Sequence, residues 1–473
     1  MKGESVWSYS PYKPPMIDTG EIYICRIAPM GNTVCVDWLG EEGAAYTFRY
    51  RLRGSEEWHE VPGTGTSAAV GGLEDCRDYE CEVICGEKKS RTRLFRTGFV
   101  PGDSVINYLH PEDDVYAFSG QYLCSPSIIR APGGYLLASM DVFKGKAPQN
   151  LTLIFRSDDD GATWKYVTEL FPCFWGKLFV HRGDIYMLSV NTEYGDLLIG
   201  RSTDGGCTFS KPVVLFRGSC GQKQPGVHKN PQPIIPYGGR LWTTLEWGSW
   251  TYGTHAAMCA SVSEEADLLD PEAWLFTEPV PYHSEWEGTA EGPSPGCIEG
   301  CMVVAPDGKL YNIMRYQIEK CVPSFGKAVV MKVNTEDPEA PLEFAKVIDF
   351  PGNHSKFMIK YHEDSGFYLS MVSYLDENHP RGRNLLSLIG SRDLNHWEKV
   401  CDVFDYSHLD EMQVGFQYID FMFEGDSILF QSRTAFNGAN NFHDANYAVF
   451  SKIDGISALL GESYGSGKKL LQN

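Results

Sequence analysis

The segment CIEGCMVVAPDGKLYNIMRYQ carries a carboxylate and a guanidinium in an arrangement that could act on a charged ligand. Glu299 precedes and Arg315 follows an Asp307-Gly308 turn, and the residues between them are mostly apolar. A DG turn between apolar runs is typical of a hairpin, so we expect the two side chains on adjacent strands at the same rim. There Glu299 could act as an acid or base, and Arg315 could bind an anionic group of a substrate.

Three further residues are candidates for proton transfer. His228 lies in GVHKNPQPII at the entrance of a predicted strand, and imidazole is the group most easily poised for proton transfer near neutral pH. A turn histidine without a catalytic role is the alternative. His181 follows KLFV at a predicted strand end, either at the ligand site or on the opposite rim. Asp141 follows the apolar run LLASM and is a candidate general acid.

Other polar groups stand among aromatic residues, a composition that suits sugar binding because rings stack on sugars and polar groups read hydroxyls. The candidates for substrate binding, besides Arg315, are Tyr418, Arg433, His443, Glu246 and Trp247. In TLEWGSWTYG, Glu246 would accept hydroxyl groups and the Trp rings would form a wall of the pocket, or lie in the core. In FHDAN, Asp444 could orient a neighbouring side chain or only cap the turn.

An internal repeat indicates the fold that positions these residues. RSDDDGATWKYV at 156–167 matches RSTDGGCTFSKP at 201–212, and SRDLNHWEKV at 391–400 is a weaker copy. The pattern resembles the Asp-box, S-x-D-x-G-x-T-W, of sialidases and related propellers. In such a turn the Asp caps backbone N–H groups, Gly supplies a positive φ, and the aromatic ring packs against the sheet. Four-stranded blades surround the repeats, and the remaining length suits six blades, with five or seven as alternatives.

The resemblance to the sialidase superfamily extends over most of residues 115–455. It implies a carboxylate bound by three arginines, a Tyr nucleophile activated by a Glu, and an Asp acid/base. Glu299 and Arg315 match the segment that supplies the Glu and the second arginine, and Asp141 resembles the start of the acid/base loop. Cys124 stands where the first arginine is expected, and a thiol cannot replace a guanidinium clamp. The resemblance therefore implies a different sugar from that of a true sialidase.

The first part of the chain predicts a separate small domain. About seven short alternating runs, separated by Gly, Asn, Pro or charged turns, lie between Glu21 and Thr97. Trp38 could fill the space between two sheets, and Leu73 with Tyr79 resembles the tyrosine corner of fibronectin type III domains. We therefore expect an all-β protein: a fibronectin type III-like β-sandwich at 1–98, then a six-bladed, sialidase-like β-propeller at 99–473.

Composition restricts the partners and the compartment. The net charge of −21 argues against nucleic acid or an anionic membrane as the main partner. The start MKGESVWSYSPYKPP lacks the apolar run of a signal peptide, and no membrane-spanning run occurs, which favours the cytoplasm. The 14 Cys form no C-x-x-C pairs, and positions such as Cys25, Cys35, Cys81 and Cys85 favour reduced, buried thiols.

The sequence shows no zinc, EF-hand, P-loop or dinucleotide pattern, so no metal and no cofactor are predicted, and a structural calcium in a loop is left open. The leading hypothesis is an exo-acting glycosidase that releases a terminal sugar from a small oligosaccharide, one that could contain a uronate. In it Glu299 and a histidine share the acid/base roles while Arg315 and Arg433 meet an anion. A uronate lyase and a non-catalytic glycan-binding propeller are the alternatives.

Overall fold

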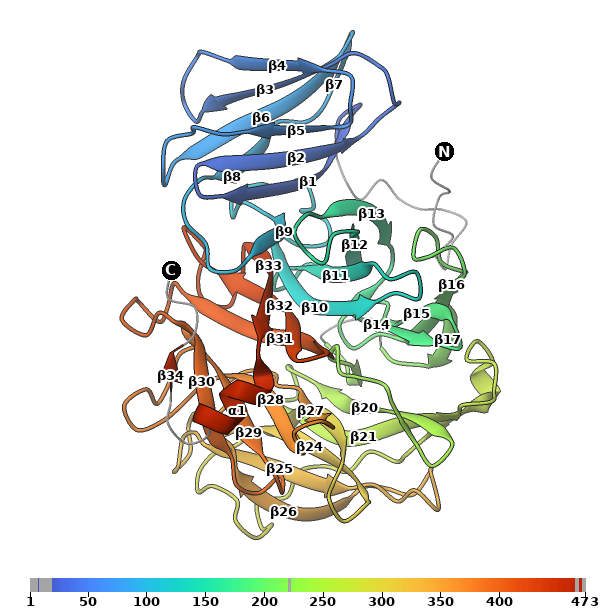
Figure 1. The fold of residues 1–473 in the computed structure, drawn as a ribbon. Coiled ribbons are helices and arrows are strands. Elements are labelled where there is room, and N and C mark those ends of the chain that lie inside the picture. Colours follow the sequence, from blue (N-terminus) through green and yellow to red (C-terminus); the bar gives the residue numbers. More distant parts are fainter. Residues whose placement is uncertain (1–6, 8–18, 220–222, 464–467, 470–473) are drawn as a thin grey trace.

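The structure, a computed structural model, describes residues 7, 19–219, 223–463 and 468–469. The start MKGESVWSYSPYKPP, for which no signal peptide was predicted, therefore lies outside the described residues except for Trp7. Strands make up nearly all of the regular structure, with a short α1 (Ile456–Ser463) near the C-terminal end (Figure 1). No helix within these ranges is long and apolar enough to cross a membrane. A small β-sandwich packs against a larger body of sheets (Figure 1).

Two antiparallel sheets form the sandwich. One sheet contains β1 (Tyr23–Met30), β2 (Thr33–Leu39) and β5 (Ser67–Val70). The other contains β3 (Tyr46–Leu52), β4 (His59–Gly63), β6 (Asp78–Cys85), β7 (Lys88–Lys89) and β8 (Arg93–Arg96). Trp38 is buried between them and stacks on Phe48 with ring centroids 6.5 Å apart. The Tyr79 hydroxyl accepts a hydrogen bond from the Glu74 N–H at 2.9 Å, which ties the strand to its preceding loop. The relation to fibronectin type III modules stays a prediction.

The cysteines of the sandwich are not all buried. Cys25 and Cys81 lie in the core, but Cys35 is exposed and Cys85 is half-buried. Cys35 lies on β2 between the buried Val34 and Val36, so the alternation of the strand turns it outward. The prediction of a buried thiol is therefore wrong for Cys35. All described cysteines of the chain are free thiols.

Six sheets follow within the described part of the chain, and their strands pair antiparallel except for β34, which pairs with β30 in parallel. The first two contain β10 (Tyr122–Arg130), β11 (Leu136–Phe143), β12 (Leu151–Ser157) and β13 (Lys165–Leu170), then β14 (Phe174–His181), β15 (Asp184–Val190), β16 (Leu197–Ser202) and β17 (Val213–Phe216). The third contains β18 (Gly226–His228), β19 (Ile235–Tyr237), β20 (Arg240–Ser249), β21 (Thr254–Ser263) and β22 (Trp274–Phe276), with a 3-10 helix at Pro271–Ala273. The fourth contains β23 (Gly296–Val304), β24 (Leu310–Gln317), β25 (Lys327–Lys332) and β26 (Glu343–Asp349).

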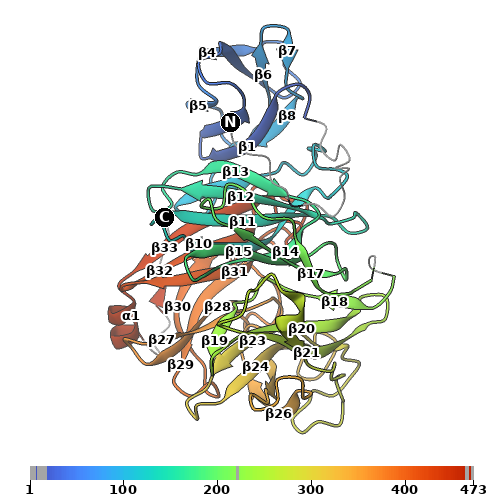
Figure 2. The same ribbon diagram turned by 90° about the vertical axis from the view of Figure 1, so that its right-hand side faces the viewer.

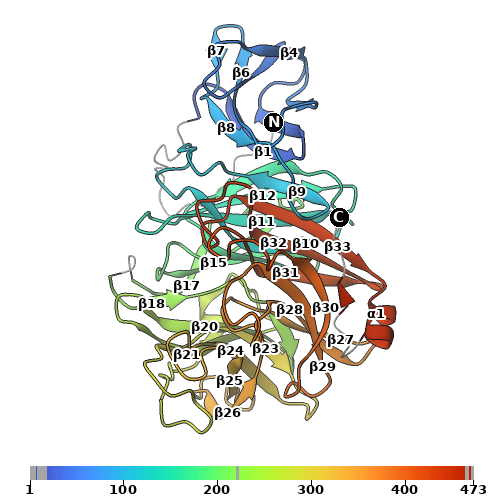
Figure 3. The same cartoon turned by 90° about the vertical axis from the view of Figure 1, so that its left-hand side faces the viewer.

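The last two sheets close the arrangement. The fifth contains β27 (Ile359–His362), β28 (Phe367–Ser373), β29 (Leu385–Ser391), β30 (Glu398–Asp405) and β34 (Lys468–Lys469). The sixth contains β31 (Gly415–Glu424), β32 (Ser427–Ala435), β33 (Tyr447–Asp454) and β9 (Ser104–Tyr108). Because β9 precedes the first sheet in the chain and pairs with β33, the sixth sheet joins the beginning of this body to its end (Figures 2 and 3).

The repeated turns have the hydrogen bonds that their sequence predicts. Asp159 accepts hydrogen bonds from the N–H and the hydroxyl of Thr163 at 2.8 and 2.5 Å. Gly161 has a φ of 91°, and the Trp164 ring is buried beneath the turn. Asp204 holds the second copy in the same way, with bonds from Thr208 of 2.9 and 2.6 Å. These turns join the last two strands of a sheet and contribute no group to the cavity described below.

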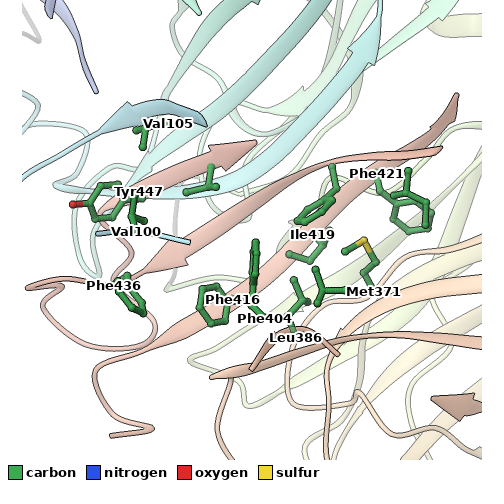
Figure 4. Close-up of a cluster of buried hydrophobic side chains, with 14 of the residues drawn as sticks. Val100, Val105, Met371, Leu386, Phe404, Phe416, Ile419, Phe421, Phe436 and Tyr447 are labelled. Carbon is green, nitrogen blue, oxygen red and sulfur yellow. The ribbon is translucent and has the colours of Figure 1, made fainter. Parts of the chain in front are cut away.

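The sandwich is held to the first and sixth sheets by polar and apolar contacts. Arg26 on β1 donates to the carbonyls of Ile106 and Val105 at 2.7 and 3.0 Å, and Arg93 on β8 pairs with Asp113 at 2.5 Å. A hydrophobic cluster continues from Val100 and Val105 past Tyr447 to the fifth and sixth sheets (Figure 4). The cluster makes the junction a packed interface.

The first strands of four sheets carry a β-bulge near their start. The register of β10, β14, β23 and β31 shifts against the next strand at these places. Four non-glycine residues there have positive φ: Ser125 (46°), Trp175 (51°), Glu299 (56°) and Tyr418 (57°). A bulge re-aims a side chain, and strained backbone is often found at functional sites. The four bulges therefore indicate that a functional site lies at this rim of the body.

Candidate active site

A cavity of about 350 Å³ opens at this rim. Its size is near the lower end of the range for small-molecule sites, so it suits one sugar unit better than a chain. It is lined by Cys124, Phe143, Gly145, Gln149, Phe174, Trp175, Glu193, His228, Trp250, Tyr418, Arg433 and His443. These residues come from the first, second, third and sixth sheets and the loops between their strands.

Glu299, Arg315 and Tyr418 form a connected group beside the cavity. Arg315 Nη1 lies 2.9 Å from Glu299 Oε2, and the Tyr418 hydroxyl donates a hydrogen bond to Glu299 Oε1. Burial would raise the pKa of Glu299, but the charge of Arg315 holds that pKa below its usual value. Burial, followed by the charge of Glu299, raises the pKa of Tyr418 well above its usual value. The phenol is therefore protonated and faces a carboxylate that can take its proton, which is the arrangement of a nucleophile with its base.

Three guanidinium groups gather around this pair, from Arg315, Arg383 and Arg433. Arg383 lies just before β29, and its Nη1 donates to the side chain of Gln417. Burial, followed by the charge of Arg315, lowers the pKa of Arg383 to about 9. The three guanidinium groups therefore share this region with two carboxylates, Glu299 and, 3.5 Å from Arg315, Glu319. A ligand carboxylate would balance the remaining positive charge.

Arg433 compensates for the absence of an arginine at Cys124. It lies on β32 opposite Gln417, and its Nη1 donates to Cys124 Sγ at 3.2 Å. The Arg433 Cζ lies 5.1 Å from the centre of the Tyr418 ring. A guanidinium is therefore present at this corner of the site although residue 124 is a cysteine, because Arg433 of the sixth sheet supplies it.

His228 and Glu246 form a second connected pair. His228 lines the cavity, and its Nδ1 lies 2.6 Å from Glu246 Oε2. Glu246 is fully buried, and its Oε1 accepts a hydrogen bond from the Gly300 N–H at 3.0 Å. Glu246 was expected to accept sugar hydroxyls, but it lies behind the histidine. It orients the ring, which leaves Nε2 for a ligand.

Asp141 lies beneath the cavity and does not line it. Its two oxygens accept hydrogen bonds from the Thr152 hydroxyl at 2.6 Å and the Trp175 N–H at 2.7 Å. Burial raises the pKa of Asp141 to about 7. Because the carboxyl holds the backbone of the Trp175 bulge, its position fits support of the site better than direct proton donation.

His443 lines the cavity beside Arg433. Its Nδ1 lies 3.1 Å from Asp444 Oδ1, and its ring meets Phe143 with centroids 5.1 Å apart. Asp444 also accepts from the side chains of Asn440 and Asn441, so it both orients the histidine and holds the turn. Burial, followed by the charge of Arg433, lowers the pKa of His443 to about 4. The imidazole is therefore neutral at pH 7 and suits hydrogen bonding to a hydroxyl.

Two predicted residues lie elsewhere. His181 is at the far end of β14, roughly 20 Å from Trp175 at about 3.3 Å per residue, and its Nε2 meets the Glu264 carbonyl at 3.0 Å. Trp247 points to the opposite face of β20 from Glu246 and packs against Phe216, with ring centroids 5.9 Å apart. Neither residue contacts the cavity, so the structure contradicts a catalytic His181 and a substrate-binding Trp247.

Several residues of the site were not predicted from the sequence. Arg383 lies in the segment PRGRN before the apolar run LLSLIG, which matches no motif, although other site residues also flank such runs. Glu193 lines the cavity and accepts hydrogen bonds from Trp250 Nε1 and Gln149 Nε2, each at 2.9 Å. It comes from a loop that carries no motif. Within the described ranges, no cluster of three or more His, Cys, Asp or Glu could hold a metal ion.

The comparisons with known proteins identify the fold. No protein-family model and no curated protein matches the chain. A leech intramolecular trans-sialidase, solved with 2,7-anhydro-Neu5Ac, has a similar structure with a TM-score of 0.50 and 10% identity, over 94% of this chain and 98% of that one. A Hadza microbial sialidase has a TM-score of 0.49 and 12% identity, over 93% of this chain and 94% of that one. An α-L-arabinanase of Penicillium chrysogenum has a TM-score of 0.46 and 13% identity, over 74% of this chain and 97% of that one. Because the identity to the leech enzyme is 10%, the likeness shows the fold alone: this chain has a sialidase-like β-propeller fold.

Proposed function

We propose that the protein is an exo-acting glycoside hydrolase that releases a terminal acidic sugar from a small oligosaccharide. The observation that carries the proposal is the hydrogen bond from Tyr418 to Glu299 next to three guanidinium groups. A cavity of about 350 Å³ supports a single sugar unit as the recognised part. Acidic sugars here include uronates and sugars with a carboxylate on the anomeric carbon.

The charges of the site favour a neutral nucleophile. A carboxylate nucleophile would repel the carboxylate of the substrate, whereas the phenol of Tyr418 carries no charge when the substrate binds. As its oxygen attacks the anomeric carbon, its proton passes to Glu299, which lies within hydrogen-bond distance. The arginines hold the substrate carboxylate and stabilise the bound geometry. Water then cleaves the bond between the tyrosine and the sugar, so the product keeps the configuration of the substrate.

His228 is the proposed proton donor for the leaving group. It lines the same cavity as Tyr418, and Glu246 holds its Nδ1, so Nε2 can donate to the glycosidic oxygen. Glu246 is fully buried behind the ring and keeps it in this orientation. The sequence predicted that Glu299 and a histidine share the acid/base roles, without saying which histidine. In the proposed reaction, Glu299 and His228 have separate roles on the nucleophile and on the leaving group.

Elimination is the second candidate function. Its support is that a phenol and an imidazole both lie near the guanidinium groups, since either could remove a proton next to a neutralised uronate carboxylate. The two reactions leave different products. Hydrolysis adds water, whereas elimination creates a C4–C5 double bond that absorbs in the ultraviolet.

A panel of oligosaccharides that end in different acidic sugars tests the proposal, with mass spectrometry and ultraviolet absorbance as readouts. Release of a hydrated monosaccharide by the wild type, lost in Glu299→Gln and kept in His181→Ala, is the expected result. The His181 variant is a matched control because that residue lies at the far rim. Binding without turnover, unchanged in Glu299→Gln, would indicate a non-catalytic glycan-binding protein.

The free thiols of the described residues also support the proposal that the protein works in a reducing compartment such as the cytoplasm.

A further inference from the structure

A second set of charged side chains lies inside the propeller, one step along the strands from the candidate active site. Lys177 is two residues after Trp175, and Asp420 is two residues after Tyr418. Lys229 directly follows His228, and Lys356 precedes β27 of the fifth sheet. A salt bridge and mutual charge interactions, described below, bring these side chains together inside the body. All four side chains are buried, with exposed fractions of 5%, 0%, 0% and 2% for Lys177, Asp420, Lys229 and Lys356.

These residues form one electrostatic group. Lys177 forms a salt bridge with Asp420. The Lys356 ammonium lies 3.4 Å from the carbonyl of Ile419, the neighbour of Asp420. Burial, followed by the charges of Lys177 and Lys356, lowers the pKa of Lys229 to about 7. Burial also lowers the pKa of Lys356 to about 8 despite the opposing charge of Asp420.

The group holds more positive than negative charge. The ammonium groups of Lys177, Lys360 and Lys356 all act on Asp420, and Lys229 adds a fourth, whereas nearby carboxylates have partners of their own. Glu246 is bound to His228, and Glu299 is bound to Arg315 and Tyr418. Burial of an unbalanced charge is costly, so each surplus ammonium must lose its proton or gain an anion.

Unfilled hydrogen-bonding groups lie in the same region. An ammonium group offers three donors, yet within the described structure Lys229 has one bond, of 2.8 Å to the Asn230 carbonyl. Asn230 is fully buried, and neither its side-chain nitrogen nor its oxygen has a partner among the described residues. The hydroxyl of Ser355, next to Lys356, is also buried without a partner there. Such groups in proteins are normally satisfied, often by a bound ion or water.

We propose that the interior of the propeller binds a small inorganic anion of the size of chloride between Lys177, Lys229 and Lys356. The anion balances the surplus positive charge and accepts hydrogen bonds from the ammonium groups, while the amide of Asn230 and the hydroxyl of Ser355 supply further donors. The exposed fractions of 5% for Lys177 and 2% for Lys356 leave little free surface, which restricts the ligand to a small ion. The anion braces strands β14 and β31, which carry Trp175 and Tyr418, so it supports the candidate active site without contacting the substrate. The inference does not depend on the proposed reaction.

Bromide is the probe, because it resembles chloride and gives an anomalous X-ray signal. Crystals of the full chain, grown without halide and soaked in bromide, should show a peak within hydrogen-bond distance of the Lys229 and Lys356 ammonium groups. Thermal unfolding should also occur at a higher temperature in chloride than in gluconate at equal ionic strength, because an ion that binds the folded state stabilises it. Lys229→Met should abolish this difference, and the exposed Lys309→Met should keep it.

The absence of a bromide peak between the lysines would overturn the proposal. A peak without any chloride effect on the wild-type unfolding temperature would indicate an adventitious ion only, which also contradicts it. If Lys229→Met fails to fold, the two wild-type measurements still decide the question.

Discussion

Arg433 Nη1 donates a hydrogen bond to Cys124 Sγ at 3.2 Å, and the two residues come from different sheets. Cys124 is near the start of β10 in the first sheet, whereas Arg433 is near the end of β32 in the sixth. The small thiol leaves room for a guanidinium that reaches across from the adjacent sheet. A positive group is therefore present at the corner of the cavity where Cys124 stands in place of an arginine.

Arg433→Met should weaken binding of the acidic sugar while leaving the fold intact. Loss of a charged hydrogen-bonding partner costs about 1.5–3 kcal/mol, which corresponds to roughly a 10- to 150-fold loss in kcat/KM, mainly through KM. Steady-state kinetics measures the effect. Arg182→Met is the matched control, because Arg182 is half-exposed in the turn at the far end of β14 and should change neither constant. An unchanged KM for Arg433→Met would contradict the role of Arg433 in carboxylate binding.

Glu299→Gln should lower kcat by about 10²- to 10⁴-fold, because the amide cannot accept the proton of Tyr418. The loss should occur with every leaving group, since the nucleophile is needed whatever the aglycone. Comparison of aryl glycosides with good and poor leaving groups tests this. If good leaving groups restored the activity of the variant, Glu299 would instead be the proton donor to the leaving group.

His228→Ala should show the opposite dependence. Glycosides with poor leaving groups should lose about 10²- to 10⁴-fold in kcat, whereas an activated nitrophenyl glycoside should lose far less, because its leaving group needs no proton. Glu246→Gln should weaken the same step, since it removes the charge that holds Nδ1. An equal loss for both kinds of substrate would assign His228 to another step.

Asp141 should make the protein less stable as the pH rises. Its folded-state pKa is raised to about 7, above the usual value near 4, so the folded state binds more protons between those limits. The free energy of unfolding should therefore fall across that window, by up to about 1.4 kcal/mol per pH unit from this group. Urea unfolding of the wild type and Asp141→Asn at several pH values measures it. If both proteins had the same pH dependence from pH 4 to 7, the raised pKa would be wrong.

The sequence predicted the propeller and the pair Glu299 and Arg315, because both depend on short-range signals. The repeats fix turns, and a DG hairpin places its two strands side by side. The apolar run KLFV does not indicate at which rim the following His181 lies. The first strands of the first, second and sixth sheets begin at the rim with the cavity, at Cys124, Trp175 and Tyr418, so His181 at the end of β14 lies at the other rim.

The rest of the site depends on contacts between sheets. The meeting of Arg433 with Cys124, and of Arg383 with the other arginines, is set by the closure of the propeller and by the bulges. Local patterns do not encode these distances. Glu246 and Trp247 were assigned together to the pocket wall, but the alternation of β20 sends them to opposite faces.

In the proposed reaction, Tyr418 attacks the anomeric carbon of an acidic sugar. The most direct measurement is mass spectrometry of peptides from protein treated with a fluorinated acidic sugar that carries a good leaving group, since fluorine slows breakdown of a covalent intermediate. A stable sugar adduct is expected on Tyr418 in the wild type, and none in Tyr418→Phe. An adduct on another residue, or turnover of the substrate panel by Tyr418→Phe at the wild-type rate, would contradict it.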